Sequence, residues 1–311
     1  MFMFEKEQVI HNVGGVNVGG TPGETATVLI GTIFYSGHKI VENAKGGIID
    51  RAAAEALIQK QDKLAGITGN PSMVQIFSES EAAMKKYIDF IVDVTASPFL
   101  IDSTEPMVRI AGLRYAEEVG LLDRAVYNSI NVSVSDEELQ ALAEIQHECA
   151  IILAFNPQDP SIAGRRLVLD EGALNLKKGL LPLSRELGVT KPLIDTATTA
   201  MGAGAGSAAA FTFVSKTVYG LPTGSGAHNA PSSWTWLRKH KKDNKEAYRV
   251  CDAASSLIVQ MMGADFILYG PIGNAERVFP AVAMADIFAA EAANLEFGTE
   301  PSADHPFKRL L

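Results

Sequence analysis

Short polar side chains follow several apolar runs of the chain, at the position where each run stops. Six of the seven are aspartate or asparagine and one is histidine: Asp102, Asn128, Asn131, Asn156, Asp195, His228 and Asn229. Carboxylates and amides offer many hydrogen-bond acceptors and donors, but this set lacks the spacing of metal ligands. The set therefore predicts a site for a neutral, nitrogen-rich heterocycle and no bound metal.

Each of these residues also has a simpler explanation. An aspartate or asparagine after a strand often caps the next helix or forms an Asx turn, and for one residue alone that role is as good an explanation as binding. Five different runs end in this way, which favours a shared site. His228 is better explained as a hydrogen-bonded structural histidine, so we assign it no catalytic role.

The elements that must position these side chains alternate regularly. Eight short apolar runs are typical of strands, at residues 27–34, 72–77, 98–103, 125–131, 150–156, 192–198, 223–228 and 265–270. Most are continuous apolar runs, which is typical of parallel strands that are covered on both faces. Parallel pairing is therefore favoured over a meander.

Helix start signals precede the amphipathic segments between these runs. Asp50 precedes a predicted helix at 51–64, and Ser78-Glu-Ser-Glu leads into one at 82–94. Ser135 opens a helix through 145, and Ser232-Ser precedes the segment 234–236. The eightfold alternation without a linker predicts an α/β protein with one (β/α)8 TIM barrel, and a doubly wound open sheet is the competing topology.

The barrel prediction fixes the division of the chain and the place of the site. Residues 1–26 alternate around Gly14-Gly15 and predict a β-hairpin that caps the bottom of the barrel. The barrel itself is expected over 27–297, with a C-terminal tail at 298–311. Since active sites of such barrels lie at the carboxyl ends of the strands, the polar set is expected at the barrel mouth.

Composition narrows the class of partner. The 311 residues carry a formal charge of −9, which disfavours nucleic acid. No apolar run reaches the roughly 20 residues of a membrane span, and the start of the chain lacks a basic segment before an apolar one. Two cysteines make neither a metal quartet nor a disulfide framework. A soluble cytoplasmic protein is expected.

Two further segments could bind anions. Met201-Gly-Ala-Gly-Ala-Gly-Ser resembles a dinucleotide loop, but its spacing is wrong and no acidic residue ends a strand about 20 residues later. We interpret it as a loop before a helix whose N-terminus, near Gly204, could hold a substrate carboxylate. The basic run Arg238-Lys-His-Lys-Lys is typical of a solvated helix face, although it could attract an acidic protein or a glutamate tail.

Five segments resemble one known family: Gly14-Gly-Val-Asn-Val-Gly-Gly, Gly31-Thr-Ile-Phe-Tyr-Ser-Gly-His-Lys-Ile-Val, Tyr127-Asn-Ser-Ile-Asn-Val-Ser, Leu153-Ala-Phe-Asn-Pro and Tyr269-Gly-Pro-Ile-Gly-Asn-Ala-Glu. They look like MtrH, the H subunit of tetrahydromethanopterin S-methyltransferase, and its bacterial relatives, the tetrahydrofolate methyltransferases of methylamine and glycine-betaine demethylation. That family is similar to the pterin-binding barrels, which include dihydropteroate synthase.

The resemblance implies transfer of a methyl group between N5 of a tetrahydropterin and the cobalt of a corrinoid. The stretch from Ser103 to Arg109 reads Ser-Thr-Glu-Pro-Met-Val-Arg, where the archaeal proteins are expected to read Ser-Thr-Ser-Gly-Glu-Ala-Arg. We therefore favour tetrahydrofolate as the carrier, and the H subunit of the methanogen complex, acting on tetrahydromethanopterin, is the alternative. The family also implies a homodimer.

The resemblance also implies roles for single residues. Asp102 and Ser103 match the pterin-binding Ile-Asp-Ser-Thr motif, while Asn128 and Asp195 match an asparagine and an aspartate on the fourth and sixth strands. With these, Asn131 is expected to complete ring recognition. Asn229 lies where the family holds the asparagine that contacts N5.

Chemistry assigns the catalytic role. The leaving amine at N5 must be made less basic, which a hydrogen-bond donor achieves. An asparagine amide donates without a particular pKa, so Asn229 is the predicted catalytic residue and Asn156 the second candidate. The chain has no Asp-x-His-x-x-Gly signature of a corrinoid module. Cobalamin is therefore expected on a separate corrinoid protein that docks over the mouth.

Two other classes remain open. One is a noncatalytic subunit that only holds a pterin for a larger complex. The other is a barrel enzyme of different chemistry, such as an aldolase or a pterin synthase. An aldolase needs a strand-end lysine, which the eight runs lack, and a synthase must bind pyrophosphate, which an acid and amide mouth disfavours.

Overall fold

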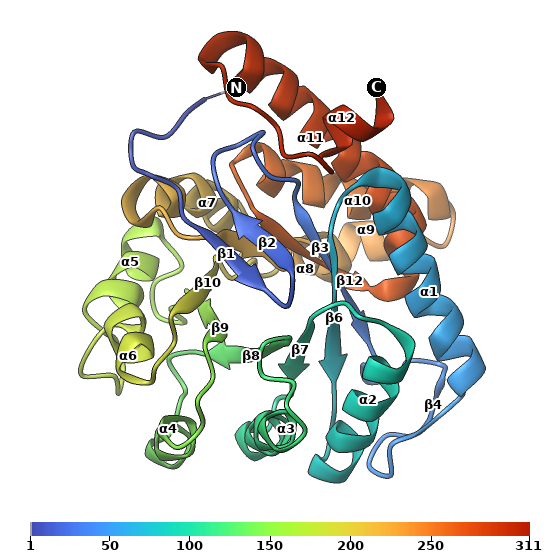
Figure 1. Cartoon of the computed structure of the whole chain (residues 1–311), viewed down its shortest axis with the longest axis vertical. Helices are drawn as coiled ribbons and strands as arrows, with labels where there is room; N and C mark the ends of the chain where they lie inside the picture. The colour runs from blue at the N-terminus through green and yellow to red at the C-terminus, as the bar shows by residue number, and fades with distance from the viewer. Residues whose placement is uncertain (1) are drawn as a thin grey trace.

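Eight parallel strands close into a barrel in the computed structural model, which describes residues 2–311 (Figure 1). In chain order the strands are β3 (Val28–Ile33), β6 (Ser72–Phe77), β7 (Phe99–Asp102), β8 (Ala125–Ile130), β9 (Cys149–Leu153), β10 (Lys191–Asp195), β11 (Thr223–Ser225) and β12 (Phe266–Pro271). The last strand, β12, pairs with the first, β3. This pairing confirms the (β/α)8 barrel and excludes the open sheet.

Helices follow each strand and form the outer ring (Figure 1). They are α1 (Arg51–Thr68), α2 (Glu81–Val94), α3 (Pro106–Glu118), α4 (Asp136–Ala143), α5 (Ile162–Asp170), α6 (Leu180–Glu186), α7 (Ala205–Tyr219), α8 (Asn229–Ser233), α9 (Thr235–His240), α10 (Lys245–Met261), the 3-10 turn η1 (Ile272–Asn274), α11 (Ala275–Phe297) and α12 (Pro306–Leu310). Asp50 and Ser135 cap α1 and α4 as predicted, each accepting a backbone N–H of the first turn.

The structure refines two local predictions and adds one element. The side chain that caps α2 is Ser80, at the end of the expected Ser78-Glu-Ser-Glu signal. Ser232 and Ser233 lie inside α8, and the chain breaks at Trp234, whose extended backbone separates α8 from α9. A second hairpin, β4 (Val41–Asn43) with β5 (Ile48–Ile49), occupies the loop after β3 and was not predicted, because both strands are short and exposed.

The predicted N-terminal hairpin lies across the bottom of the barrel (Figure 1). It consists of β1 (Ile10–Val13) and β2 (Val16–Gly19) in antiparallel pairing. Val13 and Val18 are buried in one cluster with residues of the barrel interior such as Met73. The hairpin thus covers apolar side chains at the end opposite the mouth. The division at 27 and 298 remains a prediction, and α12 lies in the segment expected as the tail.

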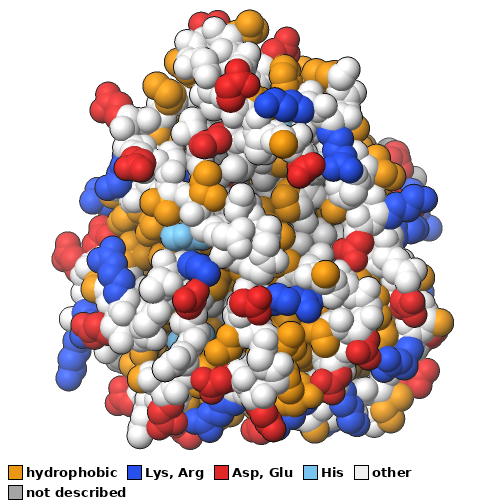
Figure 2. All heavy atoms as spheres, viewed as in Figure 1, with side chains coloured by type: hydrophobic (Ala, Val, Ile, Leu, Met, Phe, Trp, Pro, Cys, Tyr) orange, Lys and Arg blue, Asp and Glu red, His pale blue; other side chains and the backbone are white. Residues whose placement is uncertain are grey.

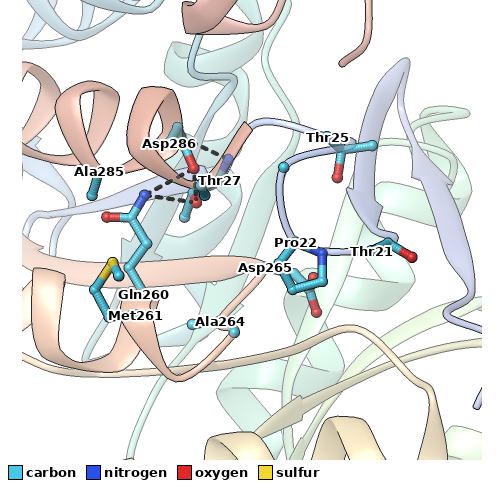
Figure 3. A pocket seen from close by; sticks show the side chains of 13 residues that line it. Thr21, Pro22, Thr25, Thr27, Gln260, Met261, Ala264, Asp265, Ala285 and Asp286 are labelled. Atoms are coloured by element: carbon cyan, nitrogen blue, oxygen red, sulfur yellow. Dashed lines mark hydrogen bonds between the residues drawn. The ribbon is translucent and has the colours of Figure 1, made fainter. Parts of the chain in front are cut away.

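The floor beside this hairpin contains a buried polar network. The carboxylate of Asp286 accepts hydrogen bonds from Thr27 N and Oγ1 and from Gln260 Nε2, at 2.7–3.1 Å (Figure 3). It also accepts one from Asn70 Nδ2 at 2.6 Å. Nearby, the fully buried Lys216 Nζ lies 2.7 Å from Asp265 Oδ1. These contacts connect the start of β3 with α10 and α11, so the network stabilises the fold.

One helical stretch, Ile272–Phe297, is long and apolar enough to span a membrane by length and composition alone. Half of its most apolar window is buried inside the fold, where α11 packs against α10 and α1 as a barrel helix. A core helix of a barrel passes the same test, so this feature is weak support for a membrane segment.

On the face shown in Figure 2, acidic and basic side chains are interspersed.

Candidate active site

The carboxyl ends of the strands bring the predicted polar residues to one end of the barrel. Asp102 is the last residue of β7 and stands directly opposite Asn128 of β8 in the strand register. Asp195 is the last residue of β10, where it pairs with Leu153 of β9. Since neighbouring parallel strands end at the same rim, these side chains share the barrel mouth.

Asp102 is held by a hydrogen-bonded row across three strands. Gln75 of β6 donates from Nε2 to Asp102 Oδ2 at 2.5 Å, and its Oε1 accepts from Thr32 Oγ1 of β3 at 2.9 Å. Burial raises the pKa of Asp102 to about 6, although Gln75 and the nearby charge of Arg109 act in the opposite direction. At pH 7 the carboxylate is therefore ionised and oriented as a hydrogen-bond acceptor.

Asp195 is a second buried carboxylate at the mouth. Its Oδ1 accepts the backbone N–H of Ala197 at 2.7 Å, and only 8% of the residue is exposed. Burial raises its pKa to about 6, and the backbone hydrogen bond and Arg165 oppose that shift. Two acceptors of the same chemistry thus lie on strands separated by β8 and β9.

A buried arginine lies behind each aspartate. Arg109 of α3 donates to the carbonyl of Ser103 at 2.6 Å and pairs with Glu138 of α4 at 2.6 Å. Arg165 of α5 donates from Nε to the carbonyl of Thr196 at 2.9 Å. Each guanidinium fixes the residue that follows the aspartate, so the helices hold the carboxylates in place through the loop backbone.

Asn229 lies at the N-terminus of α8 and is exposed. Its Nδ2 donates to the carbonyl of Thr198 at 3.3 Å. Thr198 in turn is hydrogen-bonded to Ser225, the last residue of β11, with 2.6 Å between the hydroxyl oxygens. The amide is therefore anchored through one N–H, and the amide's second N–H has no such bond within residues 2–311 and is available to a ligand.

Three other predicted residues bond to their own or a neighbouring loop. Asn156 Oδ1 accepts the N–H groups of Gln158 and Asp159, and its Nδ2 donates to Gly164 O at 3.2 Å. Asn131 Oδ1 accepts from Ser133 N at 2.9 Å. The hydroxyl of Ser103 donates to the carbonyl of Ser78 at 2.7 Å. The contacts of Asn131 and Asn156 are the Asx-turn roles that compete with binding, so Asn156 is a poor donor for N5.

Two further predicted residues lie in loops at the rim of the mouth. Gly204 precedes α7 with φ of +109°, and a Cβ there would approach Pro160 Cβ to 2.9 Å, so the loop requires glycine. Its role toward a substrate stays a prediction. His228 packs its ring against Gly270, and burial lowers its pKa. This agrees with a structural histidine.

Sequence reasoning missed Gln75, Arg109 and Arg165. Gln75 carries a signal, since it is the polar residue inside the run Ser-Met-Val-Gln-Ile-Phe. The two arginines lie in amphipathic helices, where a cation predicts a solvated face. Among residues 2–311 no group of three or more His, Cys, Asp or Glu is placed to hold a metal ion.

These features describe an eight-stranded α/β barrel whose mouth presents two separate carboxylates and an anchored amide. Residues 6–302 match the family model described as tetrahydromethanopterin S-methyltransferase MtrH subunit. The chain belongs to this family, and it is a methyltransferase.

Similar proteins cover the whole chain. The H subunit of tetrahydromethanopterin S-methyltransferase from Methanothermobacter thermautotrophicus is 52% identical over 311 residues, covering 100% of both chains. The corresponding protein of Methanocaldococcus jannaschii is 47% identical, again over 100% of both chains. Among solved structures, a dihydropteroate synthase from Yersinia pestis in complex with a sulfonamide drug superimposes with a TM-score of 0.60 at 9% identity, covering 91% of this chain and 100% of that one. That likeness concerns the fold alone.

Proposed function

We propose that this protein transfers a methyl group from N5 of a methylated tetrahydropterin to the reduced cobalt of a corrinoid carried by another protein. Tetrahydromethanopterin is the favoured carrier, because relatives at about half identity over the whole chain are named for it. This differs from the sequence-based preference for tetrahydrofolate. The Glu-Pro-Met-Val segment behind that preference forms the start of α3, where Pro106 occupies a first-turn position that suits proline.

Ring recognition is assigned to Asp102 and Asp195. The pterin ring presents an amino group and ring N–H groups, which ionised carboxylates accept with charge-assisted hydrogen bonds. The arginines behind the two loops fix the carboxylates before substrate arrives, so little ordering is needed on binding. Asn128, opposite Asp102 on the next strand, is placed to bind the same ring.

The methyl transfer itself is a displacement at carbon. The C–N bond to N5 breaks, its electron pair stays on N5, and the methyl carbon bonds to the cobalt of the partner's corrinoid. A hydrogen bond from Asn229 Nδ2 to N5 stabilises the negative charge that develops there, and N5 finally takes a proton from water. The observation that carries the proposal is this exposed amide, anchored to Thr198 in the loop after Asp195 at the mouth that also holds Asp102.

The partner proposals follow from exposed apolar side chains. Met201, in the loop after β10, and Trp236, on α9, are 46% and 56% exposed and lie on segments that follow the mouth ends of strands. They offer a contact surface to a corrinoid protein.

The outer helices α10 and α11 expose Ile258, Met284 and Phe288, and apolar surface of this kind favours a homodimer contact there.

The test is a methyl-transfer assay with free cob(I)alamin and purified protein. Methyl-tetrahydromethanopterin and methyl-tetrahydrofolate are compared under the same conditions. The proposal expects turnover, with a higher kcat/KM for the methanopterin substrate. Tight binding without turnover, both with free cob(I)alamin and with a loaded corrinoid protein, would instead indicate a noncatalytic pterin-binding subunit. A higher kcat/KM for the folate would reverse the choice of carrier.

A further inference from the structure

A second pocket, with a volume of about 350 Å³, opens beside the mouth at the ends of β11 and β12. His228 and Ser232 line it from the segment after β11, and Asn274 lines it from the segment after β12. Four cationic residues lie around it: Lys241, Lys245, Arg249 and Arg277. We call it the cationic pocket.

The charge of this pocket is opposite to that of the chain. Four cations face one carboxylate, Asp252, whereas the whole chain carries −9. Arg249 has an exposed contact to Glu246 at 3.3 Å, and the other three cations have no ion pair within residues 2–311. Burial lowers the pKa of His228, so this ring adds no positive charge at pH 7. Lys241 Nζ lies over the Tyr248 ring, 3.9 Å from its centroid, but one carboxylate does not balance four cations.

Helix stability does not explain these cations either. Lys245 is the first residue of α10, and Arg277 lies in the first turn of α11. The N-terminus of a helix is the positive end of its dipole, so cations there are unfavourable and anions are favourable. Each first turn also holds a glutamate, but Glu246 contacts Arg249, Glu276 contacts Lys60, and neither glutamate lines the pocket. The N-termini of two long helices, each with a cation, thus lie at one pocket.

Hydrogen bonds fix Arg277 at the wall of the pocket. Its Nη2 donates to Asn274 Oδ1, and Asn274 Nδ2 donates to Asp252 Oδ2 at 3.0 Å. The Nε of the same guanidinium is buried and lacks a hydrogen-bond partner within residues 2–311. Because this Nε is closed to solvent, an anion in the pocket would meet the remaining N–H groups of the guanidinium, which lines the pocket.

We infer that the cationic pocket binds the anionic tail of the reduced pterin whose ring occupies the mouth, an inference that rests on the proposed function. In a tetrahydropterin the tail is attached to C6, the carbon next to N5. Asn229 is assigned to N5, and the preceding residue, His228, already lines the pocket. The tail therefore leaves the ring beside Asn229, toward the four cations, and its carboxylate or phosphate groups match lysine and arginine donors.

The experiment compares substrates that differ only in tail charge. KM is measured for 5-methyl-tetrahydrofolate with free tail carboxylates, for the same compound with both tail carboxylates converted to amides, and for methyl-tetrahydromethanopterin, whose tail carries phosphate and carboxylates. For the wild-type protein we expect KM to be about tenfold lower for the acid than for the amide, the effect of one charge-assisted hydrogen bond. Inorganic phosphate should compete only against the charged tails.

The main variant is Lys245→Glu, which is expected to fold because an acidic residue suits the first turn of α10. It should raise KM for the charged tails about tenfold and leave KM for the amide unchanged. The matched control is Lys239→Glu, an exposed lysine of α9 outside the pocket, which should change neither. A larger effect on methyl-tetrahydromethanopterin than on the folate would identify phosphate as the main ligand group, and the reverse would identify carboxylate.

Failure of the inference is separate from failure of the proposed function. If the amide substrate is demethylated with the same KM as the acid, the methyltransferase proposal stands and the tail site is wrong. If no substrate is turned over, the methyltransferase proposal is wrong, and the tail site, which rests on it, falls with it. If Lys245→Glu slows transfer only when a corrinoid protein replaces free cob(I)alamin, the pocket docks an acidic partner, and the inference is overturned.

Discussion

Buried aspartates lie at both ends of the barrel, Asp265 and Asp286 at the floor and Asp102 and Asp195 at the mouth. At the floor, Asp286 accepts four hydrogen bonds and Asp265 is paired with Lys216 Nζ. At the mouth, Asp102 accepts from Gln75 and Asp195 from the backbone of Ala197. The pKa of Asp286 and of both mouth aspartates is raised by burial to about 6.

The difference lies in how far the protein satisfies each carboxylate. A carboxylate has about four lone-pair sites. The floor fills these sites of Asp286 with donors from three elements of the fold, whereas the mouth leaves acceptor sites open within the described chain. Carboxylates whose pKa is raised alike by burial therefore serve stability at one end and ligand binding at the other. The predictions below test this contrast, from the largest expected effect to the smallest.

The largest effect is expected at the mouth, from Asn229→Ala. Loss of a donor to the charge that develops on N5 should lower kcat about 100- to 1000-fold, with little change in KM. The side chain is exposed, so the melting temperature should not move. Steady-state kinetics with cob(I)alamin measures both parameters. A variant that raises KM and keeps kcat would make Asn229 a binding residue.

The floor gives the second largest effect, from Asp286→Ala. Four donors then lose their acceptor in a buried site, which should lower the free energy of unfolding by about 3 kcal/mol. Chemical denaturation measures this loss. The kcat/KM of the folded protein should stay within about twofold of wild type, since this network lies at the end opposite the mouth. The control is Glu291→Ala, an exposed residue on the same helix, which should change neither quantity.

Asp102→Asn is the counterpart at the mouth. The amide cannot accept as strongly from the pterin N–H groups, so KM should rise about 30-fold, equivalent to about 2 kcal/mol. The free energy of unfolding should not fall, because a buried charge with few partners is removed. If the variant unfolds more easily and binds the pterin as tightly as wild type, Asp102 stabilises the fold as Asp286 does. The proposed difference between the two ends of the barrel would then be wrong.

The smallest effect concerns pH. Burial raises the pKa of Asp195 to about 6 in the folded protein, above its unfolded value of 3.8, so the folded state binds this proton more tightly. Its ionisation therefore costs stability as pH rises through this range, and none of that cost is present below about pH 4. Asp195→Asn should raise the free energy of unfolding at pH 8 by about 1 to 2 kcal/mol, and the gain should vanish below about pH 4. Chemical denaturation at several pH values measures this gain in the free energy of unfolding. A gain that stays constant with pH would contradict the raised pKa of Asp195.

The sequence predicts the barrel well because one physical pattern repeats eight times. Continuous apolar runs indicate strands that are covered on both faces, and capping residues such as Asp50 mark where helices begin. The short strands β4 and β5 were missed because 3 and 2 residues are too few to show a periodic pattern. Strand ends follow directly from the pattern, so Asp102 and Asp195 were placed correctly at the ends of β7 and β10.

What the sequence could not predict depends on where a side chain finds its partners. Asn156 and Asn229 both follow apolar runs, yet Asn156 bonds to its own loop and Asn229 bonds across to Thr198. Local spacing does not separate these outcomes. The arginines of α3 and α5 could not be identified as buried either, because their acceptors are backbone carbonyls of the loops after β7 and β10, which the fold alone brings into reach.

The most direct test is a calorimetric titration of methyl-tetrahydromethanopterin at pH 7.5 into three proteins. These are the wild type, the double variant Asp102→Asn with Asp195→Asn, and Asp286→Ala. We predict one binding site per wild-type chain, a loss of affinity of about 100-fold or more in the double variant, and wild-type affinity in the floor variant. Wild-type affinity in the double variant would contradict the assignment of the mouth as the pterin site.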